Sequence, residues 1–260
     1  ISLIKEEQID SIVNFAAQGM VGQSWENPEH WFTTNTLGIV KLTNALKKLQ
    51  IKKYIQISSP ESYGSCNNAD ETTPYNPSTP YASSKAAGDM FIKNLIDQYN
   101  FPAIFIRSTN VYGPHQQLFR IIPRSIIYLK SNKKIHLHGG GKAVKSYLYI
   151  EDVCKGILKV LEKGKIGEVY HFSPDKGHSI EGIVKKICIK MNKDFNQSIE
   201  LVNERPGQDS EYILNSEKAR QELNWQPTID MDQGIDNTIQ WINQNWEEIK
   251  QQPLEYIHKQ

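Results

Sequence analysis

Residues 53–64 read KYIQISSPESYG and residues 80–87 read PYASSKAA, and these two stretches decide the fold of the chain. The first begins as an apolar run typical of a buried strand and ends in a turn that carries Ser59 and Glu61. Open α/β sheets bind their ligands at the carboxyl ends of the strands. We therefore expect Ser59 and Glu61 to face a ligand.

The second stretch predicts a helix over residues 81–99 that carries Tyr81 and Lys85 on one face. An ammonium group beside a phenol favours the phenolate and lowers the tyrosine pKa from about 10 towards working pH. The pair therefore predicts a base that can take a proton from a sugar hydroxyl. The Tyr-x-x-x-Lys spacing is a weak signal by itself, and it gains weight from the strand before it and from the small residues of its helix.

Strands alternate with helices along the first part of the chain. We expect strands at residues 9–15, 53–58 and 102–107, and helices at residues 27–49 and 81–99. This alternation predicts an α/β fold with a doubly wound parallel sheet. After residue 114 the pattern changes to a smaller α+β lobe, partly interleaved with the sheet domain, with strands at 135–138, 146–150 and 168–172 and helices at 121–129, 151–161, 180–191, 216–223 and 231–249.

Composition excludes several classes of protein. The formal charge of +1 over 260 residues argues against a dedicated nucleic-acid binder. No apolar run approaches the ~20 residues that cross a bilayer, and the charged start predicts no signal peptide. The three widely spaced cysteines suit reduced thiols, so we expect a cytoplasmic protein. His136 and His138 lack a third ligand nearby, and we expect no metal site.

Eight motifs follow one another in an order that resembles the extended short-chain dehydrogenase/reductase superfamily. They are similar to those of nucleotide-sugar 4,6-dehydratases of the dTDP-glucose and GDP-mannose types. The motifs are NFAAQ (14–18), TN (34–35), ISSPESYG (57–64), PxxPxxPY (74–81), YxxxK (81–85), RSTNVYGP (107–114), YIEDV (149–153) and RPGQD (205–209).

The resemblance implies an NAD-dependent lyase that converts an NDP-hexose to an NDP-4-keto-6-deoxyhexose. Tyr81, helped by Lys85, would deprotonate the sugar 4-hydroxyl, and Ser59 would hydrogen-bond the same oxygen. Glu61 would remove the proton from carbon 5, which needs a carboxylate pKa near neutrality. Pro60 stands where dTDP-glucose enzymes carry an Asp that protonates the departing hydroxyl, so Glu61 or a water would have to supply that proton.

The resemblance also implies binding residues. It divides the chain into a partial NAD-binding Rossmann domain (1–114) and a mainly nucleotide-sugar-binding lobe (115–260), and it implies a homodimer. The cofactor contacts would be Ala16, Ala17, Asn35, Ser58, Tyr81 and Lys85. The substrate contacts would be Asn110, Arg120, Lys145 and Arg205.

Two features leave alternatives open. The family's opening strand and Gly-rich loop, which hold the NAD pyrophosphate, are missing, so the chain reads as N-terminally truncated and an inactive fragment is one alternative. NAD-dependent 4-epimerases and UDP-glucuronate decarboxylases share the Ser/Tyr/Lys core. The activity of either class is therefore the other alternative. Met20 and His171 depart from the residues usual in dTDP-glucose enzymes, and the sequence does not identify the nucleotide or the sugar.

Overall fold

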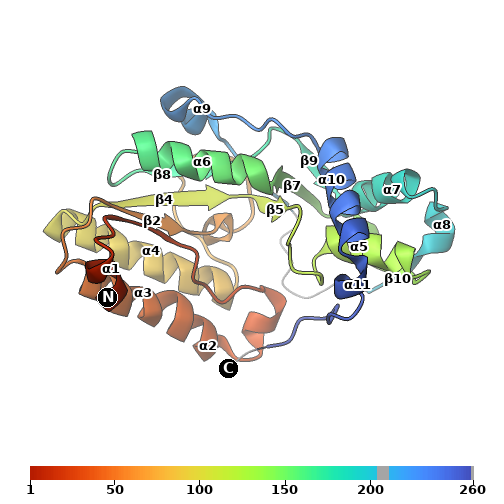
Figure 1. Ribbon diagram of the computed structural model, residues 1–260, viewed down its shortest axis with the longest axis horizontal. Coiled ribbons are helices and arrows are strands. Elements are labelled where there is room, and N and C mark those ends of the chain that lie inside the picture. The colour runs from red at the N-terminus through yellow and green to blue at the C-terminus, as the bar shows by residue number, and fades with distance from the viewer. Residues whose placement is uncertain (204–210, 259–260) are drawn as a thin grey trace. The chain divides into compact units, whose positions relative to one another are not determined.

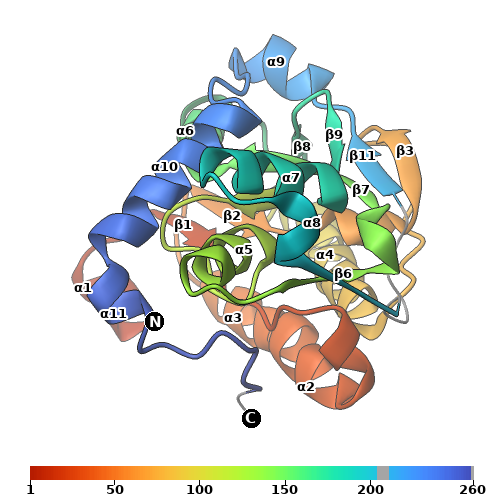
Figure 2. The same cartoon turned by 90° about the vertical axis from the view of Figure 1, so that its right-hand side faces the viewer.

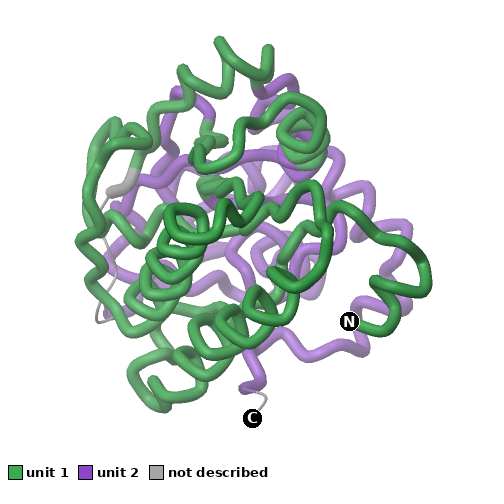
Figure 3. The backbone as a smooth tube through the Cα atoms, turned by 90° about the vertical axis from the view of Figure 1, so that its left-hand side faces the viewer, with its two compact units in different colours: residues 1–109, 154–173, 207–226 green, residues 110–153, 174–206, 227–260 purple. Residues whose placement is uncertain are grey.

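The computed structural model describes residues 1–203 and 211–258, and its internal contacts divide the chain into two compact units. Unit 1 comprises residues 1–109, 154–173 and 207–226, and unit 2 comprises residues 110–153, 174–206 and 227–260 (Figure 3). Each unit is thus assembled from segments that lie far apart in the sequence. The functional division at residue 114 stays a prediction.

A parallel sheet forms the centre of unit 1. Its strands follow the order β1 (Ser11–Asn14), β2 (Lys53–Ile57), β4 (Ala103–Ser108) and β8 (Val169–Phe172). Val13 lies opposite Ile55, and Ile55 lies opposite Ile104. Residues 103–107 of β4 are all buried, as expected for a parallel strand covered on both faces. The predicted α/β architecture with a parallel sheet is therefore confirmed.

Helices cover both faces of this sheet (Figure 1). On one face lie α3 (Ile39–Leu46) and α4 (Pro80–Tyr99), and on the other lies the part of α6 (Ile150–Lys163) that belongs to unit 1. The packing of α6 is close, since a Cβ atom on Gly156 would lie 2.6 Å from the ring of Phe172. The core under α3 and α4 consists of Ile39, Leu46, Tyr54, Ile92, Leu95, Phe101, Ala103 and Phe105.

The predicted helix over residues 27–49 is interrupted. Here α2 (Pro28–Phe32) leads into the π-helical turn η2 (Thr33–Gly38), and only then does α3 begin. One continuous α-helix was therefore the wrong prediction. Apolar residues at helical spacing continue across a single wider turn, so their periodicity does not reveal it.

Several short elements of unit 1 were not predicted, because each spans too few residues for a periodic pattern. They are α1 (Ser2–Glu6), η1 (Gly22–Trp25), η3 (Pro60–Tyr63) and the parallel pair of β3 (Cys66–Ala69) with β11 (Glu211–Leu214). The helix α9 (Glu217–Leu223) lies within the range that the sequence predicts.

Unit 2 combines short strands with three helices that pack together, α5 (Ile121–Lys130), α7 (Ile180–Lys190) and α10 (Met231–Gln244) (Figure 2). β5 (Asn110–Tyr112) and β7 (Val144–Tyr149) are parallel, and β9 (Gly177–Ser179) runs antiparallel to β7. β6 (Ile135–His138) pairs in parallel with β10 (Ile199–Val202). The remaining elements are η4 (Gly139–Gly141), α8 (Phe195–Ser198) and α11 (Trp246–Ile249).

The helix predicted over residues 231–249 is interrupted at Asn245. α10 stops at Gln244, and α11 begins after Asn245. The side-chain amide of Asn245 donates to the carbonyl oxygen of Trp241 at 2.8 Å. Asparagine side chains compete in this way with the backbone ladder of a helix. The prediction of one helix over residues 231–249 was therefore wrong.

Candidate active site

The segment after β2 carries two of the predicted catalytic residues. Ser59 caps η3, because its Oγ accepts a hydrogen bond from the backbone N–H of Glu61 at 3.3 Å. Pro60 occupies the first position of η3, where its missing N–H costs no hydrogen bond. Ser59 is buried and Glu61 is half-buried. Pro60 has no side-chain proton to donate, so Glu61 is the acidic group of this turn.

The other two predicted catalytic residues lie near the start of α4. Thr79 caps this helix by accepting a hydrogen bond from the N–H of Ala82 at 3.2 Å. Tyr81 is half-buried, and its backbone N–H donates to Ser24 Oγ at 3.1 Å. Helix α4 packs against η3, so the turn with Ser59 and Glu61 and the helix with Tyr81 and Lys85 are neighbours within unit 1.

Lys85 is a buried cation at this junction. Only 2% of its surface is exposed, and its Nζ donates to the carbonyl oxygen of Ile57 at 2.8 Å. Burial lowers the pKa of Lys85, whereas the carboxylate of Asp89 one turn later raises it. The bond to Ile57 leaves two ammonium hydrogens for other acceptors.

Asn35 holds the loop that follows β1. Its Oδ1 accepts from the backbone N–H of Gln18 at 2.7 Å, and its Nδ2 donates to the Gln18 carbonyl at 3.0 Å and to Ser84 Oγ at 3.0 Å. Asn35 lies in the π-helical turn η2, and such turns are frequent at functional sites. A buried amide thus joins the loop to α4.

The described residues fit part of a dinucleotide. Ala16 and Ala17 follow β1, are exposed and carry nothing beyond Cβ, so a ligand can approach their backbone. Ala16 N–H donates to Asn14 Oδ1 at 3.2 Å, which fixes the turn. These features lie at the carboxyl ends of β1 and β2, where doubly wound sheets bind nucleotides.

A buried polar cluster contacts Ser58 and Tyr63, the residues on either side of the turn with Ser59 and Glu61. Asp89 accepts hydrogen bonds from Ser58 Oγ and, at 3.0 Å, from Arg107 Nη2. Arg107 also donates to the hydroxyls of Tyr63 and Tyr75. The sequence reasoning missed these contacts, although an Asp four positions after Lys85 and an Arg ending an apolar strand are visible signals.

The predicted substrate-binding residues lie in unit 2 or outside the described residues. The side chain of Asn110, on β5, donates to the carbonyl of Ser146 at 3.2 Å, next to Lys145 on β7. Arg120 is exposed just before α5, with its guanidinium 5.5 Å from the centre of the Phe119 ring. Arg205 lies outside the described residues. Their roles stay proposals.

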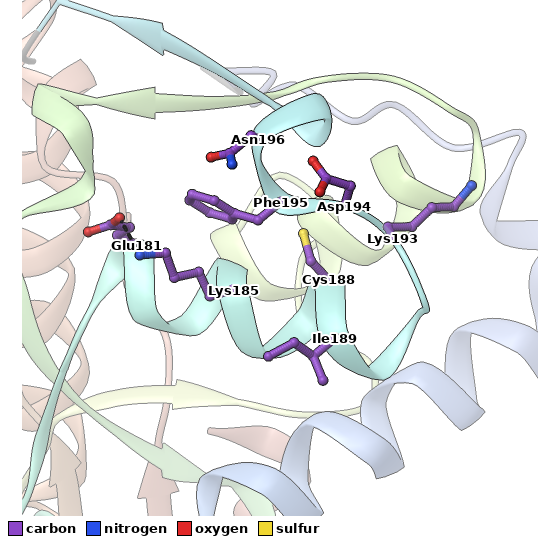
Figure 4. Close-up of a pocket in the computed structure, with 8 residues that line it drawn as sticks. All are labelled: Glu181, Lys185, Cys188, Ile189, Lys193, Asp194, Phe195 and Asn196. Atoms are coloured by element: carbon purple, nitrogen blue, oxygen red, sulfur yellow. Dashed lines mark ion pairs between the residues drawn. The ribbon is translucent and has the colours of Figure 1, made fainter.

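A hollow in unit 2 involves none of the predicted residues (Figure 4). In it, Lys185 forms an ion pair with Glu181 at 2.7 Å, and its ammonium lies 5.0 Å from the centre of the Phe195 ring. The hollow is lined by Glu181, Lys185, Cys188, Ile189, Lys193, Asp194, Phe195 and Asn196. Of its other charged groups, Lys193 donates to Asn132 Oδ1 at 2.9 Å, and Asp194 accepts from the backbone N–H of Gln197 at 2.8 Å.

Two kinds of feature are absent from residues 1–203 and 211–258. No described helix combines the length and the apolar character needed to cross a membrane. The same residues contain no group of three or more His, Cys, Asp or Glu side chains placed to hold a metal ion.

Comparison with known proteins gives close matches. The family model described as GDP-mannose 4,6 dehydratase matches residues 1–238. The human protein named dTDP-D-glucose 4,6-dehydratase is 36% identical over 252 residues, which cover 94% of this chain and 71% of that protein.

Solved structures agree. The crystal structure of dTDP-glucose 4,6-dehydratase from Bacillus anthracis in complex with NAD is 35% identical, with a TM-score of 0.87 and coverage of 95% of this chain and 76% of that chain. UDP-glucose 4-epimerase from Thermotoga maritima has a TM-score of 0.89 at 23% identity, with coverage of 94% and 81%. At that identity the likeness shows the fold alone.

Proposed function

The chain belongs to the GDP-mannose 4,6-dehydratase family, and we propose that it converts an NDP-hexose to an NDP-4-keto-6-deoxyhexose with loss of water. It is an NAD-dependent nucleotide-sugar dehydratase, in agreement with its relatives. One structural observation carries the assignment of roles. The bond from Lys85 to Ile57 places the Tyr81 helix at the carboxyl end of β2, next to Ser59 and Glu61.

Tyr81, Lys85 and Ser59 act on the hydroxyl at carbon 4 of the sugar. Tyr81 takes the hydroxyl proton, and the nearby ammonium of Lys85 stabilises the phenolate that this transfer requires. Ser59 hydrogen-bonds the same oxygen as it becomes a ketone. Ala16, Ala17, Asn35, Ser58, Tyr81 and Lys85 would hold NAD, and the bound cofactor would accept hydride from carbon 4 and return it to carbon 6.

Glu61 acts on carbons 5 and 6. The ketone at carbon 4 acidifies the proton on carbon 5, and the Glu61 carboxylate removes it. Because Pro60 carries no acid, Glu61 itself passes the carbon-5 proton to the departing hydroxyl of carbon 6, which leaves as water. Carbon 5 then regains a proton from solvent as hydride adds at carbon 6, and Tyr81 releases to solvent the proton that it took from the 4-hydroxyl, so the protons balance. One carboxylate thus serves first as base and then as acid.

The nucleotide and the assembly are further parts of the proposal. Asn110, Arg120, Lys145 and Arg205 contact the sugar and the diphosphate, whose negative charge suits the three cations. We also propose a homodimer formed through the surface of α3, η2 and α4, where Leu37, Met90 and Tyr99 expose apolar side chains. A cytoplasmic location fits Cys66, Cys154 and Cys188, none of which forms a disulfide.

The test uses protein expressed from its complete reading frame. Incubation with dTDP-, UDP-, GDP- and CDP-hexoses is followed by mass spectrometry of the products. Loss of one water from one substrate, abolished in Glu61→Gln, supports the proposal. An epimer of unchanged mass, or loss of carbon dioxide from a uronate, would replace it by the epimerase or decarboxylase function, and no turnover of any sugar would reject it.

A further inference from the structure

The segment of residues 58–63 contains both Ser59 and Glu61, and buried polar groups hold it at both ends. At its start, Ser58 Oγ donates to Asp89 Oδ2, and the carbonyl of the preceding Ile57 accepts from Lys85. Both partners lie on α4, one turn apart. The start of the segment is thus fixed to the helix that carries Tyr81.

At its end, the hydroxyl of Tyr63 contacts two partners. Arg107 Nη1 donates to this hydroxyl, and His171 Nε2 lies 2.8 Å from it. The same guanidinium donates to Asp89 Oδ2 at 3.0 Å through Nη2. Arg107 therefore joins the two ends of the 58–63 segment through one rigid, planar group.

The hydrogens of this cluster can be placed without conflict. Arg107 only donates, and the Asp89 carboxylate only accepts. His171 Nδ1 lies 3.1 Å from the carbonyl oxygen of Asn215, which can only accept, so Nδ1 carries the ring hydrogen. His171 Nε2 then accepts the hydrogen of Tyr63, and the Tyr63 oxygen is free to accept from Arg107.

The members of this cluster are shielded from water. Arg107 is 2% exposed, Tyr63 2%, and Asp89 and His171 are fully buried. Such a cluster is costly to break, because each lost bond leaves a buried polar group unsatisfied. Its geometry is therefore tightly determined, and so is the backbone that it holds.

From this geometry we infer that Arg107 is a positioning residue, which acts through Tyr63 and Asp89 to hold Glu61 in place for the reaction at carbon 5. The inference rests on the proposed function. Arg107 does not touch the reacting atoms in this role. A displacement of about 1 Å at a reacting group lowers a rate by up to about 100-fold, so a residue of this kind has a measurable effect.

Two tyrosines allow a matched test. Tyr63 and Tyr75 both bind the Arg107 guanidinium through their hydroxyls, and the guanidinium carbon lies 4.6 Å and 4.8 Å from the two ring centres. Only Tyr63 belongs to the 58–63 segment. Tyr63→Phe and Tyr75→Phe therefore remove the same group from the same cation, and only Tyr63→Phe releases the segment.

The first readout is amide hydrogen exchange of residues 58–64, which needs no turnover. We expect faster exchange in Tyr63→Phe and unchanged exchange in Tyr75→Phe. Equal exchange in the parent and in Tyr63→Phe overturns the inference. If Tyr63→Phe does not fold, Ser58→Ala releases the other end of the segment, and the same two outcomes apply to its exchange.

The second readout is kinetic. We expect Tyr63→Phe to lower kcat by about 10-fold with little change in KM, and to increase the isotope effect of deuterium at carbon 5 but not at carbon 4. A loss of kcat with unchanged isotope effects would overturn the role at Glu61. If the parent turns over no sugar, the proposed function fails, and the exchange experiment still decides whether the segment is held by this cluster.

Discussion

The amino nitrogen of Lys85 lies 2.8 Å from the carbonyl oxygen of Ile57, the last residue of β2. This contact ties the helix of the proposed base to the strand whose carboxyl end carries Ser59 and Glu61. Lys85 is buried, so the bond also satisfies a cation that water does not reach. One side chain thereby has a structural contact and a proposed chemical role.

Replacement of Lys85 by Met tests the chemical role. Methionine matches the unbranched stem of lysine and removes the charge, so we expect a folded protein whose kcat is lower by about 100-fold or more. Lys93→Met is the control, because Lys93 lies exposed on the same helix. Steady-state kinetics on the preferred nucleotide sugar measure kcat of both variants. Equal kcat values would show that Lys85 has no chemical role in the reaction.

His171 predicts a pH dependence of stability. Burial lowers the pKa of His171 to about 3, and the nearby Arg107 and Lys218 act in the same direction. The ring is therefore neutral, and the carboxylate of Glu71 at 3.9 Å is not its ion partner. In the unfolded chain the ring binds a proton near pH 6.5. The neutral His171 ring therefore makes its full contribution to the free energy of unfolding above about pH 6.5. This contribution is lost as pH falls from there towards about 3.

Urea unfolding at about pH 7 and at about pH 5 measures this effect. The asparagine of His171→Asn does not titrate. Between these two pH values we therefore expect the free energy of unfolding of this variant to fall by about 2 kcal/mol less than that of the parent. The comparison cancels the carboxylates that titrate in both proteins. Parallel losses in the two proteins would mean that His171 is protonated in the folded state.

The proposed catalytic pattern was visible in the sequence because its parts are local. Tyr81 and Lys85 are four residues apart, and Thr79 and Pro80 mark the start of their helix, so both the helix and the shared face follow from spacing. The strand that ends before Ser59 was equally readable from its apolar run. Short-range signals of this kind do not depend on the rest of the fold.

The buried polar cluster around Arg107 could not be predicted from the sequence, because its members come from distant segments. Tyr63, Asp89, Arg107 and His171 meet only when η3, α4, β4 and β8 pack together. The positions of Asp89 and Arg107 are visible signals, but nothing in the sequence shows that these two residues meet Tyr63 and His171. The π-helical turn at Asn35 was not predicted for a related reason. The side chain of Asn35 contacts Gln18 and Ser84 rather than residues of its own helix.

Gly88 predicts a steric effect on the cofactor side of the site. A Cβ atom there would lie 2.6 Å from the carbonyl oxygen of Asn35 and 2.9 Å from Ile39 Cδ1. Gly88→Ala therefore forces α4 away from η2, and we expect a loss of about 1–3 kcal/mol in the free energy of unfolding, with weaker NAD binding. Gly22→Ala is the control, since its Cβ would meet nothing within 4 Å. Chemical denaturation and calorimetric titration with NAD measure the two effects.

Pro60 offers a test of how the leaving hydroxyl is protonated. Under the proposal, Glu61 returns its own proton because Pro60 cannot donate one. Pro60→Asp adds a carboxyl group at the first position of η3, where a negative charge is favourable. If proton delivery limits the rate, this variant raises kcat by up to about 10-fold, since a positioned general acid contributes about that much or more.

Pro60→Ser, which adds a hydroxyl without an acid, is the matched control. A gain in both variants would point to a change in backbone geometry, and a loss in Pro60→Asp alone would mean that the added charge hinders the Glu61 carboxylate.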